Sequence, residues 1–251
     1  MKALPASLQQ GLRIVQLLVL CALALQAVFV LRIAAMALVD PQSTTFQRSE
    51  IWRLLVERHR IAWSQSWVDG ARISVQLKRA VIASEDANFA DHAGIEWDSI
   101  EKAWQKNQRA EDRVDRLRQR QPARPPQLKL VGGSTISQQL AKNLFLSGER
   151  TVLRKAQELV LTVALETLLS KQRLLEIYLN NVEWGEGLFG AEAASRHYFH
   201  VDAARLSPEQ AARLAVMLPA PKRFEKSPAS PYVLARAATI ESRMGAVELP
   251  R

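Results

Sequence analysis

The chain has 251 residues, enough for one sizeable domain or for a membrane anchor followed by one domain. Its formal net charge is +9, which is typical of proteins that meet nucleic acid, anionic lipid or a phosphorylated substrate. The sequence contains no zinc-finger spacing, aromatic-basic RNA motif or Walker loop, so nucleic acid is not an expected partner. A single cysteine, Cys21, excludes an internal disulfide.

An apolar segment near the N-terminus predicts a membrane anchor. Residues 14–31 carry no charge, and their number is close to what a helix needs to cross a bilayer. A cleavable signal peptide is the alternative, because Ala35-Met36-Ala37 resembles a cleavage site, but the apolar core is longer than in most signal peptides. We therefore expect a retained helix over 14–32. The flanking charges favour residues 1–13 in the cytoplasm and the rest of the chain on the other side.

The segment that follows, residues 33–72, mixes aromatic and basic side chains. Residues 46–67 combine Trp52, Trp63 and Trp67 with several arginines, as an amphipathic helix at a membrane interface does. A surface helix whose aromatic side chains complete the core has the same pattern. Both interpretations stay open at this point.

Residues 73–228 are expected to form one mainly α domain, because alternating β patterns are scarce. The expected features are a buried helix over 73–84, a charged and proline-broken segment whose part 110–131 is mobile, helices from 134 onwards, and a capped helix that starts at Ser207. Residues 229–251 are assigned to a C-terminal tail.

Adjacent carboxylates, Glu85 and Asp86, end the apolar stretch of the first of these helices. Apolar surroundings raise the pKa of a carboxyl group toward the range that suits a general base, and we expect this for Glu85. The alternative is a helix end that exposes both carboxylates to solvent. His92 lies close enough in the sequence to orient the pair.

A second motif, Gly132-Gly133-Ser134-Thr135, precedes a helix with amide and ammonium groups. If Ser134 caps this helix, then Ser134, Gln138 and Lys142 lie along one face, because they recur every four residues. These donors beside the free N–H groups of a helix N-terminus favour phosphate binding. A merely solvated polar face is the alternative.

Three charged residues interrupt a helix that is otherwise nearly all apolar: Arg154, Lys155 and Glu158. Arg154 and Glu158 have the spacing of an i,i+4 ion pair, which alone contributes only about 0.3–0.5 kcal/mol. A charged cluster on a largely buried helix must face a partner or a polar cleft, because desolvation is costly. We expect it to face Glu85 and Lys142.

Taken in chain order, these motifs resemble those of the peptidoglycan glycosyltransferases. The resemblance spans residues 81–221 and rests on Glu85-Asp86-x-x-Phe89-x-x-His92-x-Gly94, Gly133-Ser134-Thr135-Ile136-Ser137-Gln138-Gln139-x-x-Lys142-Asn143, Arg154-Lys155-x-x-Glu158 and Tyr178-Leu179-Asn180 with Gly185 and Gly190. The chain has no room for a transpeptidase domain after this region, so it most resembles the monofunctional biosynthetic peptidoglycan transglycosylases. Ser137 and Glu96 depart from the usual Thr and Asp but keep the functional group.

The resemblance implies a lysozyme-like, mainly α fold with a smaller lobe near the membrane, and lipid II as the substrate. The growing glycan on undecaprenyl pyrophosphate would be the donor. The 4-hydroxyl of an incoming lipid II would attack the donor's anomeric carbon, forming a β-1,4 link with inversion. It also implies the bacterial inner membrane as the location, a periplasmic catalytic domain, and membrane lipids and proteins of cell division or wall synthesis as partners.

Matched by position, the resemblance implies that Glu85 is the general base and Asp86 an orienting group. Glu158 would be the second essential carboxylate, near the donor pyrophosphate and a divalent cation, magnesium or manganese, whose protein ligands stay unassigned. The implied substrate-binding residues are Ser134, Thr135, Gln138, Lys142, Arg150, Arg154, Lys155 and Asn180.

Two other functions fit parts of the sequence. A lytic muramidase would share the fold and one catalytic glutamate, but it has less need for a cationic cluster. A membrane-tethered scaffold without catalysis has no need for intact Glu85 and Glu158.

Overall fold

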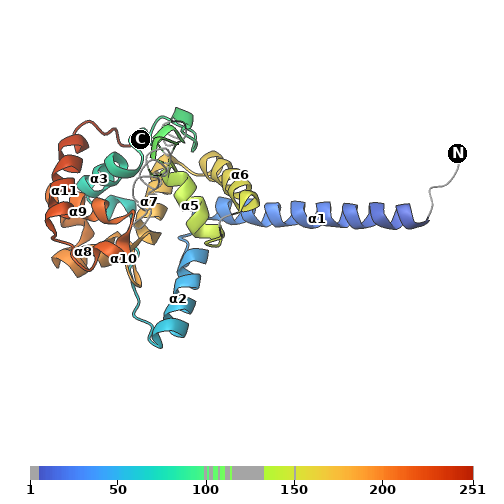
Figure 1. Ribbon diagram of the computed structural model, residues 1–251, viewed down its shortest axis with the longest axis horizontal. Coiled ribbons are helices and arrows are strands. Elements are labelled where there is room, and N and C mark those ends of the chain that lie inside the picture. The colour runs from blue at the N-terminus through green and yellow to red at the C-terminus, as the bar shows by residue number, and fades with distance from the viewer. Residues whose placement is uncertain are drawn as a thin grey trace.

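The computed structural model describes residues 6–98, 101, 104–106, 108–110, 114, 133–149 and 151–250. The prediction of a mainly helical chain is confirmed (Figure 1). The elements, in chain order, are α1 (Ala6–Ala35), α2 (Thr45–Arg58), β1 (Ser64–Gln65), η1 (Gly70–Arg72), α3 (Val75–Glu85), α5 (Ile136–Phe145), α6 (Val152–Leu168), α7 (Lys171–Asn181), β2 (Glu183–Gly185), β3 (Leu188–Phe189), α8 (Ala191–Phe199), η2 (Ala203–Arg205), α9 (Pro208–Met217), α10 (Pro221–Phe224) and α11 (Pro231–Met244).

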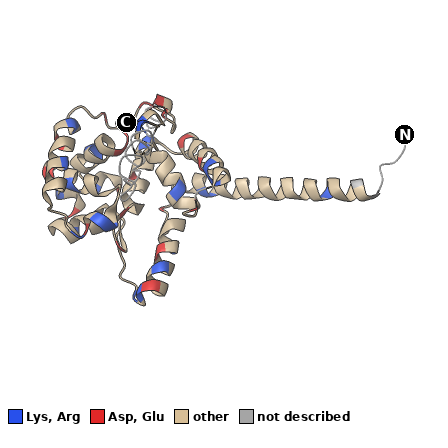
Figure 2. Ribbon diagram, viewed as in Figure 1, with Lys and Arg blue, Asp and Glu red and all other residues tan. Residues whose placement is uncertain are grey.

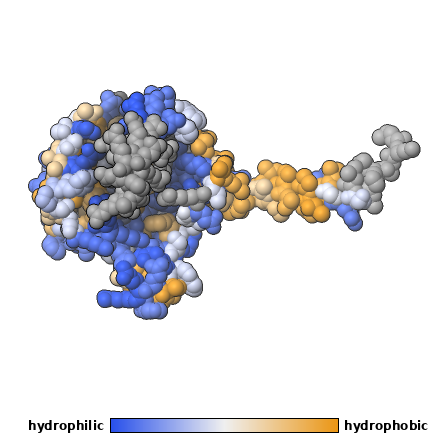
Figure 3. All heavy atoms as spheres, in the orientation of Figure 1, coloured by the Kyte–Doolittle hydropathy of each residue, from blue (hydrophilic) through white to orange (hydrophobic). Residues whose placement is uncertain are grey.

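Helix α1 leaves the domain as a single straight rod (Figure 1). Its segment Gln9–Ala35 is 27 residues long and reaches a mean hydropathy of 2.7. The rod is almost free of charged residues (Figure 2) and its surface is apolar, whereas the visible face of the domain is mainly hydrophilic (Figure 3). Its length and composition suit a membrane-spanning helix, and the predicted span 14–32 lies within it.

The last turns of α1 are part of the folded domain. Gln26 and Gln157 of α6 exchange two amide hydrogen bonds, of 2.8 and 3.1 Å. Phe29 packs edge-on against Phe145 at 5.4 Å between ring centroids, and Ile33 is fully buried. These contacts favour a retained anchor, because cleavage after residue 37 would remove them.

Helices α3, α9 and α11 form the part of the core that is farthest from α1 (Figure 1). The predicted start of α9 is confirmed, since Ser207 caps it in a capping box with Gln210. Residues 229–251, assigned to a tail from the sequence, include α11, whose apolar face is buried against α3 and α9. That face consists of Val233, Ala237, Ile240 and Met244.

A small sheet with strand order β1-β3-β2 links α2 to the core. Strand β1 pairs parallel to β3, and β2 pairs antiparallel to it. Gly187, between β2 and β3, has φ +72°, and a Cβ there would lie 1.9 Å from the carbonyl oxygen of Ala62. A side chain at this position would therefore separate β1 from the hairpin.

The aromatic residues of 46–67 divide between the two interpretations that the sequence left open. Trp63 stacks on Phe189 at 4.6 Å between ring centroids, so it completes the domain. Trp52, in the middle of α2, is 68% exposed. The mobility predicted for 110–131 concerns residues that, apart from Ala110 and Val114, lie outside the described part of the chain.

Candidate active site

Glu85 occupies the C-terminal end of α3, where apolar packing brings it into the protein. Leu77 and Val81 of the same helix are fully buried, and Ser74 caps its start by accepting the N–H of Gln76 at 3.1 Å. Burial raises the pKa of Glu85, as predicted, and the nearby Asp86 carboxylate adds to this, while hydrogen bonds from Gln139 and Ser84 oppose it. A carboxylate so placed can accept a proton.

Asp86 lies in the turn after α3 and joins that turn to α5. The Gly94 N–H donates to His92 Nδ1 at 3.0 Å, so the ring proton is on Nε2, which donates to Asp86 Oδ1 at 2.8 Å. The other oxygen, Oδ2, accepts the N–H of Ile136 at 2.9 Å, the first residue of α5. Asp86 is buried and fully engaged, which fits an orienting position beside Glu85.

Thr135, and not Ser134, is the N-cap of α5. Its hydroxyl accepts the N–H of Gln138 at 3.2 Å and donates to the carbonyl of Gly94 at 2.7 Å. The expectation that Ser134 caps the helix is therefore wrong, because Thr135 and Gln138 form the capping box. Thr135 is buried with its hydroxyl engaged, which also argues against the substrate contact predicted for it, whereas Ser134 is exposed.

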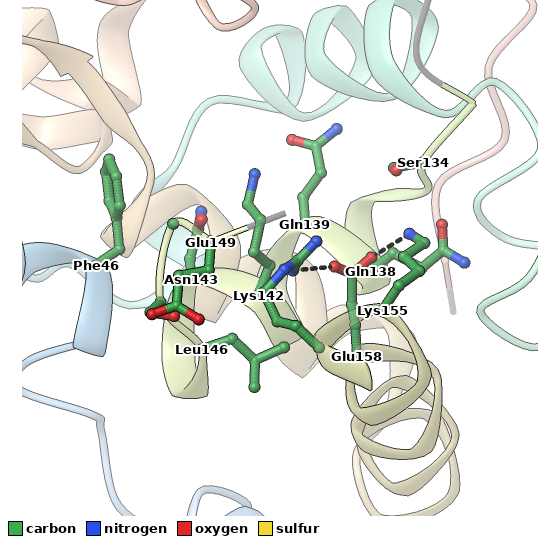
Figure 4. A pocket seen from close by; sticks show the side chains of 13 residues that line it. Phe46, Ser134, Gln138, Gln139, Lys142, Asn143, Leu146, Glu149, Lys155 and Glu158 are labelled. Atoms are coloured by element: carbon green, nitrogen blue, oxygen red, sulfur yellow. Dashed lines mark hydrogen bonds and ion pairs between the residues drawn. The ribbon is translucent and has the colours of Figure 1, made fainter. Parts of the chain in front are cut away.

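A pocket of about 330 Å³ opens between α5, α6 and the first turn of α2. The predicted trio Ser134, Gln138 and Lys142 does line it. So does Gln139, which projects from α5 in the same direction as Lys142 (Figure 4). The buried Gln138 Nε2 has no hydrogen-bond partner among the described residues, so it is a donor available to a ligand.

Cationic side chains surround a buried carboxylate on the α6 side of this pocket. Arg154 Nη1 donates to Glu158 Oε2 at 2.7 Å, and Lys155 binds the other oxygen (Figure 4). Burial lowers the pKa of the Lys142 ammonium; Glu158 opposes this, and the charges of Arg154 and Lys155 add to it. The three cations outnumber the two carboxylates that line the pocket, buried Glu158 and exposed Glu149, so the site suits an anion such as a diphosphate.

Glu85 faces a second pocket, of about 250 Å³, which Arg223, Tyr232 and Arg236 also line. The charged cluster around Glu158 was expected to face both Glu85 and Lys142. It shares the first pocket with Lys142, whereas Glu85 lines the second pocket, and Gln139 connects the two. This side chain lines the first pocket, and its Nε2 donates to Glu85 Oε2 at 3.0 Å.

Gln139 and Tyr178 are site residues that the sequence reasoning did not select. The Tyr178 hydroxyl donates to Gln139 Oε1 at 3.0 Å, which leaves the amide nitrogen of Gln139 to face Glu85. Burial raises the pKa of Tyr178, so the phenol keeps its proton. Both residues belong to the motifs that carry the family resemblance, so the sequence does mark their segments. No local pattern, however, distinguishes Gln139 from Gln138.

Asn180 has a different role from the one predicted. It is fully buried in α7, its Oδ1 accepts the N–H of Val68 at 2.9 Å, and its Nδ2 donates to the carbonyls of Val68 and Glu176. Its polar atoms are buried and bound to the backbone, which argues against the substrate contact predicted for it. Arg150, another predicted contact, lies outside the described residues.

The described residues do not form a metal site around Glu158. They include no group of three His, Cys, Asp or Glu side chains that could hold a metal ion. Both oxygens of Glu158 already bind cationic side chains. This donor set suits an anion better than a cation.

Known proteins identify the family to which this fold and site belong. The transglycosylase family model matches residues 55–245. The chain is 51% identical over 228 residues to a biosynthetic peptidoglycan transglycosylase of Burkholderia thailandensis, covering 91% of this chain and 83% of the relative. A protein of that name from Paraburkholderia xenovorans is 49% identical over 91% of this chain and 88% of its own length. A third, from Bordetella pertussis, is 50% identical over 84% of this chain and 82% of its own length. The chain therefore belongs to the transglycosylase family.

Proposed function

We propose that this chain polymerises lipid II into glycan strands by inverting transfer of a chain linked to undecaprenyl pyrophosphate. The observation that carries the proposal is the pairing of a half-buried carboxylate, Glu85, with a cationic pocket through one side chain, Gln139. A base and an anion site that are joined by one side chain suit attack by a hydroxyl on a carbon that bears a phosphate leaving group. The names of the relatives support the same reaction.

On the acceptor side, Glu85 takes the proton from the 4-hydroxyl of the incoming lipid II. The raised pKa of Glu85 makes its carboxylate a stronger proton acceptor than a solvated glutamate. The hydroxyl oxygen forms a bond to the donor's anomeric carbon as the bond from that carbon to the phosphate oxygen breaks. Asp86 holds the turn that carries Glu85, because it binds both His92 and α5.

On the donor side, the leaving group is a diphosphate, which departs as an anion. Lys142, Arg154, Lys155 and the Nε2 donor of Gln138 are the groups of the pocket that would hold it. A preorganised set of donors stabilises negative charge as it develops, so the site needs no general acid such as a glycosidase requires. Glu158 fixes Arg154 and Lys155 in place, since it binds one of them with each oxygen.

The divalent cation that the resemblance implies finds no protein ligand set among the described residues. The proton transfer to Glu85 and the departure of the diphosphate do not depend on this cation. The diphosphate oxygens of the substrate are the groups that would bind magnesium or manganese here.

The proposal extends to where the enzyme works. Helix α1 anchors the chain in a membrane, and we place that anchor in the bacterial inner membrane, with residues 1–13 in the cytoplasm and the catalytic domain in the periplasm. Membrane lipids and the growing glycan strand are then its immediate partners, with proteins of cell division or wall synthesis as further ones.

Incubation of the purified full chain with labelled lipid II tests the proposal. Gel separation should show glycan strands with the unaltered chain and none with Glu85→Gln, and parallel reactions with a chelator report any cation requirement. Release of fragments from preformed glycan, without polymer from lipid II, would instead identify a muramidase.

A further inference from the structure

A second cluster of charges joins α2 to the domain on the side away from α6. Lys222 of α10 lies between two carboxylates, at 2.7 Å from Glu50 of α2 and 3.3 Å from Glu183 of β2. The side chains of Glu50 and Glu183 are only 5% and 9% exposed. This lysine is therefore the bridge between three separate elements.

The two carboxylates are not equivalent. Burial opposes ionisation of Glu50, but hydrogen bonds from Arg53 and Lys222 outweigh it and lower the pKa of Glu50. Burial raises the pKa of Glu183 to about 7, and Lys222 counters this only in part, while Glu50 and Glu225 add to it. Glu183 Oε1 has no hydrogen-bond partner within the described chain, although the Lys222 ammonium is near.

The remaining charges around Lys222 do not supply that missing partner. On α2, Arg53 is already bound to Glu50, Glu57 and Glu186. Beyond β2, Glu225 accepts the N–H of Glu186 at 2.6 Å, and the Tyr198 hydroxyl of α8 donates to the carbonyl of Trp184. Lys222 is thus the one described cation within reach of Glu183 that can be shared.

We propose that Lys222 is a positioning residue whose ammonium is shared unequally between Glu50 and Glu183, and that ionisation of Glu183 draws it away from α2. The ammonium is closer to Glu50 than to Glu183, which is the arrangement that a neutral Glu183 favours. When Glu183 loses its proton, the unpartnered oxygen becomes a buried negative charge and competes for Lys222.

Loss of the contact between Lys222 and Glu50 would affect the diphosphate pocket, because α2 contributes to both. Phe46, in the first turn of α2, lines that pocket, and Glu50 follows one turn later. A weaker ion pair between Glu50 and Lys222 therefore makes α2, and with it Phe46 in the pocket wall, more mobile. The effect should fall on substrate binding, since neither Lys222 nor Glu183 lines either pocket.

Hydrogen exchange of residues 45–58, corrected for the intrinsic effect of pH, tests the proposal in the full chain without using activity. Protection of α2 should fall roughly tenfold between pH 6 and pH 8, the scale of a hydrogen bond to a charged group. Glu183→Gln should keep the pH 6 level at both pH values, and Glu50→Gln should show low protection at both. The exposed Glu57→Gln is the matched control and should behave like the unaltered chain.

Equal protection of the unaltered chain at both pH values, or the same fall in Glu183→Gln, would overturn the proposal. A second, kinetic experiment rests on the proposed function. Between pH 6 and pH 8, KM for lipid II should rise more in the unaltered chain than in Glu183→Gln, while kcat of the two proteins stays similar. Comparison at equal pH cancels the titration of Glu85. If the unaltered chain makes no polymer, the proposed function fails, while the exchange measurement still decides the role of Lys222.

Discussion

Gln139 donates its amide N–H to the Glu85 carboxylate at 3.0 Å, and this bond joins the proposed base to the wall of the anion pocket. The Gln139 side chain thus contacts the carboxylate and also lines the pocket that holds the cations. An anomeric carbon held near Gln139 would have both a base and a site for its leaving group within reach, and inversion further requires that the two lie on opposite faces of the sugar.

Glu85→Gln should abolish polymerisation and leave the fold intact, because it removes the proton acceptor and keeps the size of the side chain. Loss of a general base typically lowers the rate by about 10²–10⁴-fold. Lipid II turnover and melting temperature are the measurements, with the exposed Glu101→Gln as a nearly silent control. Turnover within a factor of a few of the unaltered chain would remove Glu85 from this role.

Gln139→Leu should move the acidic limb of the pH profile of kcat/KM to higher pH. The Gln139 hydrogen bond favours ionised Glu85, so its loss raises the pKa of Glu85 further. A bond of this kind corresponds to a shift of about one pH unit. Tyr178→Phe keeps the amide beside Glu85 and should shift the limb less; a limb that stays in place in Gln139→Leu contradicts the assignment.

Lys142→Ala should impair use of the donor far more than folding. Removing one preorganised electrostatic contact costs about 3–4 kcal/mol of transition-state stabilisation. The melting temperature should change little, since the Lys142 side chain lines the pocket and is not part of the core. Partial rescue by Lys142→Arg, together with weaker binding of a phosphoglycolipid inhibitor to the alanine variant, would support the anion pocket. Normal turnover and binding would show that Lys142 is only a solvated helix residue.

Asn180→Ala should destabilise the protein without a selective effect on KM. The change leaves the N–H and carbonyl of Val68 without their partners, and such a loss costs about 3 kcal/mol in the free energy of unfolding. Denaturant unfolding measures this, and Gln105→Ala on an exposed helix is the control. If the variant were as stable as the unaltered chain and had a raised KM, the result would support the substrate contact predicted from the sequence.

Glu183→Gln should stabilise the protein at pH 8 relative to pH 4. The folded pKa of about 7 lies above the ordinary value of 4.5, so folding takes up a proton between these values and stability is lost as pH rises through that window. The glutamine is neutral throughout and escapes this loss, which amounts to about 3 kcal/mol at pH 8. The measurement is denaturant unfolding of the unaltered chain, Glu183→Gln and the control Glu57→Gln at the two pH values. Equal changes in the free energy of unfolding of all three proteins would contradict this expectation.

Local patterns in the sequence were sufficient for much of this protein. The apolar length of α1, the capping box of α9 and the i,i+4 pair of Arg154 and Glu158 depend on residues within one or two turns of each other. The carboxylate at the end of an apolar helix likewise predicted the raised pKa of Glu85. Each of these features is set by neighbours in the chain, so periodicity and spacing reveal it.

Tertiary structure alone decided which polar side chains face the pockets. Thr135 became the cap because its hydroxyl reaches Gly94, Asn180 turned inward to bind Val68, and Gln139 rather than Gln138 met Glu85. These partners are separated by 41, 112 and 54 residues. The sequence by itself therefore determined the elements and the types of chemistry they carry, while the burial of each polar group depended on contacts that form only when distant segments pack together.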